Sequence, residues 1–145
     1  MKVRTAFLAS VAPLATAAGL VTAAAPANAA GPCGAGYRLL DPVRPVTSAG
    51  GATGGYIYVY WNGSTGENCA VVRPIDAWAG KVDDVAVAIS TSTASDSDVS
   101  ESGKGYRYYA GPAYVSARNT CINVYGGVLY GDVVYTGSYR NIHCD

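Results

Sequence analysis

The sequence predicts an all-β fold, a small disulfide-stapled sandwich or barrel of short antiparallel strands. Three observations lead to this prediction. Short runs of aromatic and β-branched residues alternate with turns that contain glycine or proline. Four cysteines, an even number, are available for two disulfides. No segment shows a convincing amphipathic helical period. Short strands at this close spacing are typical of sandwiches and small barrels.

The first 29 residues indicate where the protein works. Lys2 and Arg4 precede an apolar, alanine-rich run, and the run ends at Ala27-Asn28-Ala29, which has the small residues of a cleavage site. We expect a signal peptide over residues 1–29 and a single secreted β domain over residues 30–145. A membrane anchor is the alternative, but prolines interrupt the run and alanine is a weak driver of insertion. No other segment is apolar enough to span a membrane.

The charge of the chain argues against binding to nucleic acid. Basic and acidic residues balance at 10 each, and removal of Lys2 and Arg4 with the signal leaves a small negative charge. The chain has no block of like charges. Nucleic-acid binding normally requires a basic face, and adhesion to an anionic membrane requires a basic patch. We therefore expect neither partner for the mature protein.

The segment from residue 31 to residue 55 is predicted to be an ordered loop. Its prolines, Pro32, Pro42 and Pro45, exclude a helix. A short strand is expected only at Tyr37–Leu40.

The clearest predicted strand is Tyr56–Trp61, in which every residue is aromatic or β-branched. A turn at residues 62–66 leads to a return strand at residues 69–72, so the two strands form a hairpin. Alternation places Tyr56, Tyr58 and Tyr60 on one face of the first strand. Tyrosine offers both ring area and a hydroxyl, so this face is the candidate binding surface. The alternative is that the tyrosines form one wall of the core.

The second half of the chain repeats the same pattern. Val82–Ser90 is predicted to be a buried strand, and Thr91–Lys104 a solvated polar connection. Further short strands are expected at 106–109, 113–117, 120–125 and 128–135, with Gly126-Gly127 as the last turn. Tyrosines in this half carry the same ambiguity between surface and core: Tyr106, Tyr108, Tyr109 and Tyr114.

The cysteines are predicted to form two disulfides. Export favours oxidation, and the spacing lacks the CxxC pattern of zinc ribbons and redox motifs. Three pairings are possible. We favour Cys33–Cys69 with Cys121–Cys144, because each bridge then closes a local loop near one end of the domain.

Catalytic groups are scarce. His143 is the sole histidine, and no G-x-S-x-G elbow supports a triad built on it. We interpret it as a histidine held beside the Cys144 disulfide, and we predict no catalytic residues.

Two groups of acidic residues are candidates for other chemistry. Asp83-Asp84 precedes the buried strand, and Asp96, Asp98 and Glu101 lie in the polar connection. Paired carboxylates can hydrolyse glycosides, and oxygen ligands can hold calcium. The second group lacks the glycine and spacing of an EF-hand loop. We interpret both groups as solvated and predict no metal site and no cofactor.

Several segments, which follow one another in the same order along the chain, resemble the spore-associated protein A family of small secreted actinobacterial proteins. They are Cys33-Gly34-Ala35-Gly36-Tyr37, Tyr58-Val59-Tyr60-Trp61-Asn62, Gly66–Val71, Tyr109–Ala117 and Cys121-Ile122, with a cysteine almost at the C-terminus. The resemblance implies secretion and association with the spore or cell surface, and it implies no reaction.

The sequence therefore predicts a secreted, non-enzymatic protein that associates with the spore or cell envelope. The alternative is an extracellular binding module for a cell-wall glycan or for a protein partner, as in a secreted inhibitor. An enzyme is the third hypothesis.

Overall fold

A computed structural model describes residues 30–101 and 105–144, and the predicted signal peptide lies outside these residues. The described residues form eight strands and one turn of 3₁₀-helix, η1 (Asp76–Trp78). The strands are β1 (Arg38–Thr47), β2 (Thr53–Asn62), β3 (Glu67–Pro74), β4 (Asp84–Ser90), β5 (Ser95–Val99), β6 (Ala110–Ser116), β7 (Ile122–Tyr130) and β8 (Val133–Ile142). All strand pairs are antiparallel, so the all-β prediction is confirmed.

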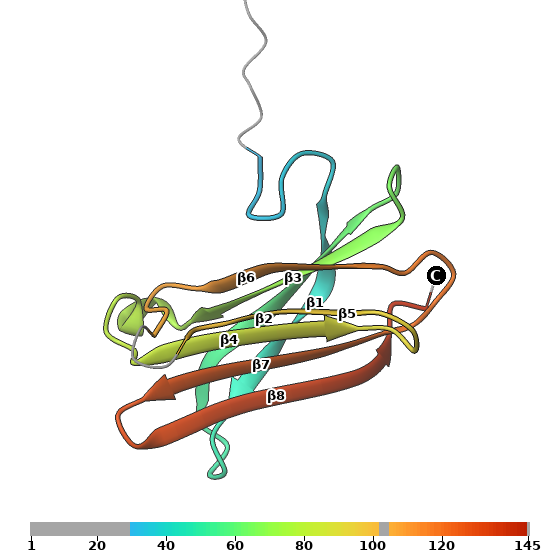
Figure 1. The fold of residues 1–145 in the computed structure, drawn as a ribbon. Coiled ribbons are helices and arrows are strands. Elements are labelled where there is room, and N and C mark those ends of the chain that lie inside the picture. The colour runs from blue at the N-terminus through green and yellow to red at the C-terminus, as the bar shows by residue number, and fades with distance from the viewer. Residues whose placement is uncertain (1–29, 102–104, 145) are drawn as a thin grey trace, which may run out of the picture.

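The eight strands form one sheet that folds over on itself, in the order β5-β4-β7-β8-β1-β2-β3-β6. The fold line is the junction between β8 and β1, where a single pair, Thr47 with Thr136, connects the two halves. Figure 1 shows the half made of β1, β2 and β3 crossing the half made of β4, β7 and β8. The result is a flattened, nearly closed barrel, in agreement with the predicted sandwich or barrel.

The barrel closes between β5 and β6 through side chains. Asp98 accepts a hydrogen bond from the backbone N–H of Gly111 at 2.6 Å, and Asp96 accepts one from the N–H of Tyr114 at 2.8 Å. These aspartates stand opposite Val87 and Ile89 on β4, so they point to the same side of the sheet as the core. Figure 1 shows β5 between β4 and β6. Inward-pointing charges at an edge strand also disfavour edge-to-edge pairing with another chain.

The core fills the space between the two halves with small and β-branched side chains. One half contributes Ile57, Val59 and Val72, and the other contributes Val85, Val87 and Ile89, all of them buried. Alternation along each strand puts these residues on one face, as the sequence predicts for Tyr56–Trp61 and Val82–Ser90. Tyr135 and Trp78 close one end, where their ring centroids lie 5.2 Å apart.

The N-terminal part of the domain differs from the expected loop. A strand of 10 residues, β1, replaces the short strand predicted at Tyr37–Leu40. It runs through Pro42 and Pro45, and its pairing with β2 is irregular between Leu40 and Arg44. Pro42 lies inside this irregularity, where no ladder hydrogen bond is required from it, whereas Pro45 pairs in register with Tyr56.

Three predictions in the second half were wrong in detail. The segment Thr91–Lys104 contains β5, because its aspartates bind β6 instead of water. Residues 106–109 lie outside the strands and form part of the connection to β6. Gly126-Gly127 is no turn, since β7 continues through both glycines to Tyr130. The chain turns instead at Gly131-Asp132, before β8.

Both disulfides are present in the pairing that the sequence analysis favours. Cys33 is bonded to Cys69, and Cys121 is bonded to Cys144. The first bridge attaches the segment before β1 to the outer face of β3, and the second attaches the end of the chain to the start of β7. Each bridge contributes roughly 2–4 kcal/mol by restricting the unfolded chain.

Gly126 and Gly127 provide a matched pair that tests the packing of the core. A Cβ at Gly126 would lie 2.7 Å from Ile57 Cγ1 and 2.8 Å from Val72 Cγ2. A Cβ at Gly127 would lie 3.4 Å from the Tyr125 hydroxyl on the outer face. We predict that Gly126→Ala lowers the free energy of unfolding by about 1–3 kcal/mol through overpacking. Gly127→Ala should change it by less than about 0.5 kcal/mol. Urea unfolding measures both, and equal stability of the two variants would contradict the described register of β7.

Candidate functional site

The predicted tyrosine face lies on the outside of the barrel. Tyr56, Tyr58 and Tyr60 are half-buried, while the alternating residues Ile57 and Val59 are 0% and 3% exposed in the core. The tyrosines therefore do not line the main core. They are also not fully open to solvent, because neighbouring groups cover part of each ring.

Tyr60 belongs to a second, smaller apolar cluster on this outer face. The buried residues of the cluster are Cys33, Cys69 and Val71, and the half-buried rings packed on it are Tyr37, Tyr60 and Tyr114. The Tyr114 hydroxyl donates a hydrogen bond to the Cys33 carbonyl at 3.1 Å. The rings of Tyr37 and Tyr114 meet edge to face at 5.8 Å. This cluster holds the segment before β1 against the sheet, so the role of Tyr60 is structural.

Tyr56 and Tyr58 lie beyond this cluster, next to a cation. Arg73 pairs with Tyr56 across β2 and β3, and its guanidinium carbon lies 5.9 Å from the centroid of the Tyr58 ring. A cation at this distance from an exposed ring contributes about 0.5–1 kcal/mol. The arrangement presents two aromatic rings and a positive charge together on the outer face of the sheet.

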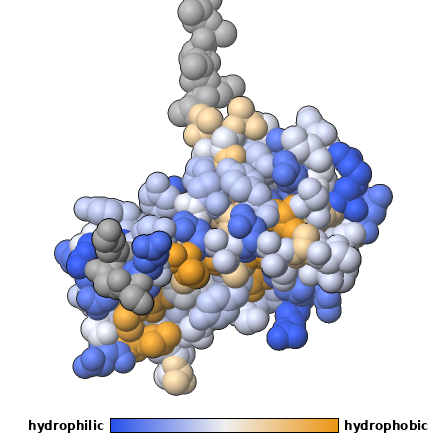
Figure 2. Space-filling model, in the orientation of Figure 1, coloured by the Kyte–Doolittle hydropathy of each residue, from blue (hydrophilic) through white to orange (hydrophobic). Residues whose placement is uncertain are grey.

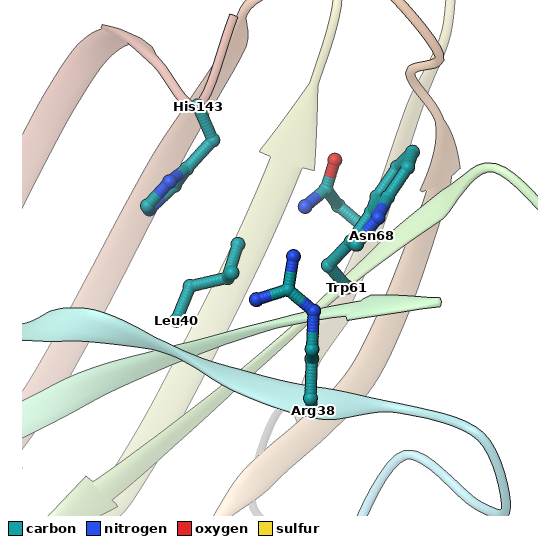
Figure 3. Close-up of a pocket in the computed structure, with 5 residues that line it drawn as sticks. All are labelled: Arg38, Leu40, Trp61, Asn68 and His143. Atoms are coloured by element: carbon teal, nitrogen blue, oxygen red, sulfur yellow. The ribbon is translucent and has the colours of Figure 1, made fainter. Parts of the chain in front are cut away.

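His143 lines a small hollow at one end of the barrel. The other lining residues are Arg38, Leu40, Trp61 and Asn68, and the free volume of the hollow is about 20 Å³. This is room for about one water molecule. Figure 3 shows Arg38 and Leu40 extending from β1 and His143 from the C-terminal segment. Neither a hydroxyl nor a carboxylate side chain is among the described residues that line this hollow, so it offers His143 no nucleophile.

The acidic residues stabilise backbone groups. Asp84 Oδ1 accepts hydrogen bonds from the N–H groups of Val85 and Tyr106, and its Oδ2 accepts one from the Ser100 hydroxyl. Asp83 accepts one from the N–H of Gly131 in the turn between β7 and β8. Within residues 30–101 and 105–144, no three His, Cys, Asp or Glu side chains gather as a metal site would require.

The most exposed tyrosines lie elsewhere than on β2. Tyr108 and Tyr109, in the connection before β6, are 65% and 50% exposed, and Tyr106 is exposed beside them. Tyr125 is 42% exposed on the outer face of β7. Sequence reasoning did not single out Tyr125. Its alternation with the apolar residues Ile122, Val124 and Val128 was the signal that could have found it.

Comparison with known proteins gives one informative match. The chain is 38% identical over 97 residues to a protein named Spore-associated protein A from Streptomyces coelicolor. The chain is a relative of spore-associated protein A. The match covers 67% of this chain and 56% of that protein, so the chain spans about half the length of the curated relative it matches. The resemblance indicated by the sequence motifs is confirmed. No family model and no solved structure match the chain.

Among the residues that the structure describes, helical structure is limited to a single short turn. None of it has the length and apolar character of a helix that crosses a membrane.

Two tyrosines in the disulfide cluster generate a prediction about alkaline pH. Burial raises the pKa of Tyr60 above its ordinary value of 10.0, and burial together with the Glu67 carboxylate raises the pKa of Tyr37. As the pH rises above 10, Tyr37 and Tyr60 therefore lose their phenolic protons in the unfolded chain before they lose them in the folded chain. The contribution of these two tyrosines to the free energy of unfolding should be fully present below pH 10, and it should be lost as the pH rises through their pKa values in the folded protein. A tyrosinate absorbance titration of the native protein should show a late-titrating component.

The control for this titration is Tyr60→Phe. The variant should lose one late-titrating phenol and should show a weaker loss of stability at alkaline pH. If every phenol of the native protein titrates together near its ordinary pKa, the packing of this cluster is contradicted.

Proposed function

We propose that this is a secreted, non-enzymatic protein that associates with the spore or cell surface. The observation that carries the proposal is its similarity to a protein named Spore-associated protein A, together with a fold in which several tyrosines lie on outer faces. Two disulfides are typical of a protein that works outside the cytosol. Secretion itself follows from the predicted signal peptide at residues 1–29.

The small hollow at His143 supports the absence of catalysis in this proposal. A triad needs a nucleophile within hydrogen-bond reach of the histidine and an acid to orient it. The described lining of the hollow supplies Arg38, Leu40, Trp61 and Asn68 instead. Catalysis by His143 would also need space for a substrate, and about 20 Å³ is far below the size of a small-molecule site.

The contact surface that we propose is the outer face of β2 at Tyr56 and Tyr58, beside Arg73. Aromatic rings with a polar tip suit a surface that is partly wet. Because the net charge of the chain is close to zero, long-range attraction contributes little, and adhesion should depend on contact. Binding of this kind persists when salt screens the charges.

A binding module for a protein partner is the second candidate function. The observation that favours it is the exposed connection before β6, where Tyr106, Tyr108 and Tyr109 flank Arg107 in the sequence. Tyrosine and arginine are enriched among the residues that carry the energy of protein interfaces. This candidate predicts that substitutions in the connection, and not on β2, abolish binding.

A sedimentation assay with purified spores and cell envelopes tests the proposal. The native protein should bind them in preference to an inert surface and should remain bound after a wash at high salt. Combined replacement Tyr56→Ser and Tyr58→Ser should lower the bound fraction severalfold by removing ring contacts. Tyr60 is left in place because it packs on the disulfide cluster.

The matched control is the combined replacement Tyr108→Ser and Tyr109→Ser, which removes the same groups from another surface. Loss of binding in the control alone would favour the protein-partner candidate. No preference of the native protein for spores or envelopes would contradict the proposal. A hydrolytic activity that His143→Ala abolishes would contradict its non-enzymatic part.

A further inference from the structure

A second hollow lies on the outer face of the half made of β4, β7 and β8. Neither the disulfide cluster nor the β2 tyrosines line it. Its free volume is about 300 Å³. Its lining includes Ala88 and Ser90 from β4, Asn123 and Tyr125 from β7, and Ser138 and Arg140 from β8. Small-molecule sites begin at about this size.

Tyr125 forms one wall of this hollow. It stands between Ala88 on β4 and Ser138 on β8 in one row across the sheet, and these small neighbours leave the ring 42% exposed. A Cβ at Gly127, two residues along the strand, would lie 3.4 Å from the Tyr125 hydroxyl. Residues two apart on a strand are about 7 Å apart. The ring therefore extends along β7 over Gly127 and away from Asn123, so it borders the hollow at one end and its exposed face lies beside the hollow.

Polar groups line the hollow on the side of Tyr125 that is away from Gly127. Asn123 Oδ1 accepts a hydrogen bond from the N–H of Asn141 at 3.1 Å, which orients the side-chain amide and leaves its NH₂ group as the donor. Ser90 lies opposite Asn123, and Ser138 lies opposite Tyr125. The Cys121–Cys144 bridge anchors the end of the chain close to these residues. The donors thus come from a part of the sheet that is held in place.

Arg140 is the charged residue of this lining, and neither aspartate nor glutamate is among the described residues around the hollow. A guanidinium group matches a carboxylate with two parallel hydrogen bonds. The chemistry of the hollow therefore favours an anionic ligand. The apolar surface of the same sheet gathers at its other end, near Val133 and Val134, and Figure 2 shows apolar groups near the turn between β7 and β8.

We propose that this hollow binds a saccharide that carries a carboxylate. One sugar ring of the saccharide packs its C–H groups on the exposed face of Tyr125, and the next ring of the saccharide fills the hollow. The ring hydroxyls pair with Asn123, Ser90 and Ser138, and the carboxylate pairs with Arg140. The proposal adds a second, salt-dependent contact to the adhesion through β2, and it rests on the surface association proposed above, since envelope polymers are the surroundings of such a protein.

Isothermal titration of the intact secreted protein with tetragalacturonate, an acidic saccharide, tests this site. Cellotetraose, a neutral saccharide, is the comparison ligand. The native protein should bind the acidic saccharide at least tenfold more tightly than the neutral one, and added salt should weaken the binding. Tyr125→Ala should lower the affinity for tetragalacturonate at least tenfold. Arg140→Gln should remove most of the preference for the acidic ligand.

Matched control variants are Tyr109→Ala and Arg107→Gln, which remove the same groups from the connection before β6. Both should bind tetragalacturonate as the native protein does. Absence of binding by the native protein, equal binding by Tyr125→Ala, or equal affinity for the neutral saccharide would each overturn the proposal. If spores are bound but tetragalacturonate is not, the inference fails alone. If neither is bound, the proposed surface association fails as well.

Discussion

The fold depends on two carboxylates that close the sheet where its backbone does not. Asp96 and Asp98 accept hydrogen bonds from the backbone of β6, at Tyr114 and Gly111. Hydrogen bonds to a charged group are about twice as strong as neutral ones, so two of them hold the edges of β5 and β6 together without a ladder. Because the sheet is joined at this seam and at Thr47–Thr136, the two halves face each other and bury a common core.

The closed barrel has two outer faces, one on β2 and β3 and one on β4, β7 and β8, and the two differ in how much of their surface is open to a ligand. The face of β2 and β3 carries the disulfide cluster, so part of its tyrosine surface serves to hold the N-terminal segment. The face of β4, β7 and β8 has no such cover over Tyr125 among the described residues, and its small neighbours leave that ring open. The hollow at His143 has room for about one water molecule. Binding at outer faces therefore fits this architecture better than chemistry in a cleft does.

Local sequence patterns predicted the strands in which core-facing and surface-facing residues alternate strictly. They failed for segments whose structure depends on partners far away in the chain. Tyr56–Trp61 and Val82–Ser90 alternate between core and surface, and their faces follow from that alternation. The segment around Asp96 and Asp98 has the composition of a solvated loop, and it becomes a strand because β6 supplies amide donors. Gly126 looks like a turn residue in the sequence, but it lies inside β7, at a position where Ile57 and Val72 leave no room for a side chain. Tyr125 could have been found from its place in the alternation, whereas the hollow beside it depends on the register of β4 and β8.

Amide hydrogen exchange at Gly111 and Tyr114 tests the closure of the barrel most directly. These two N–H groups lie 2.6 Å and 2.8 Å from the carboxylate oxygens of Asp98 and Asp96. Both amides should exchange slowly in the native protein. Asp98→Ala should accelerate exchange at Gly111, and Asp96→Ala should accelerate exchange at Tyr114, because each amide then loses its acceptor. Exchange of both native amides at the rate of an unstructured peptide would contradict the closure of the barrel by Asp96 and Asp98.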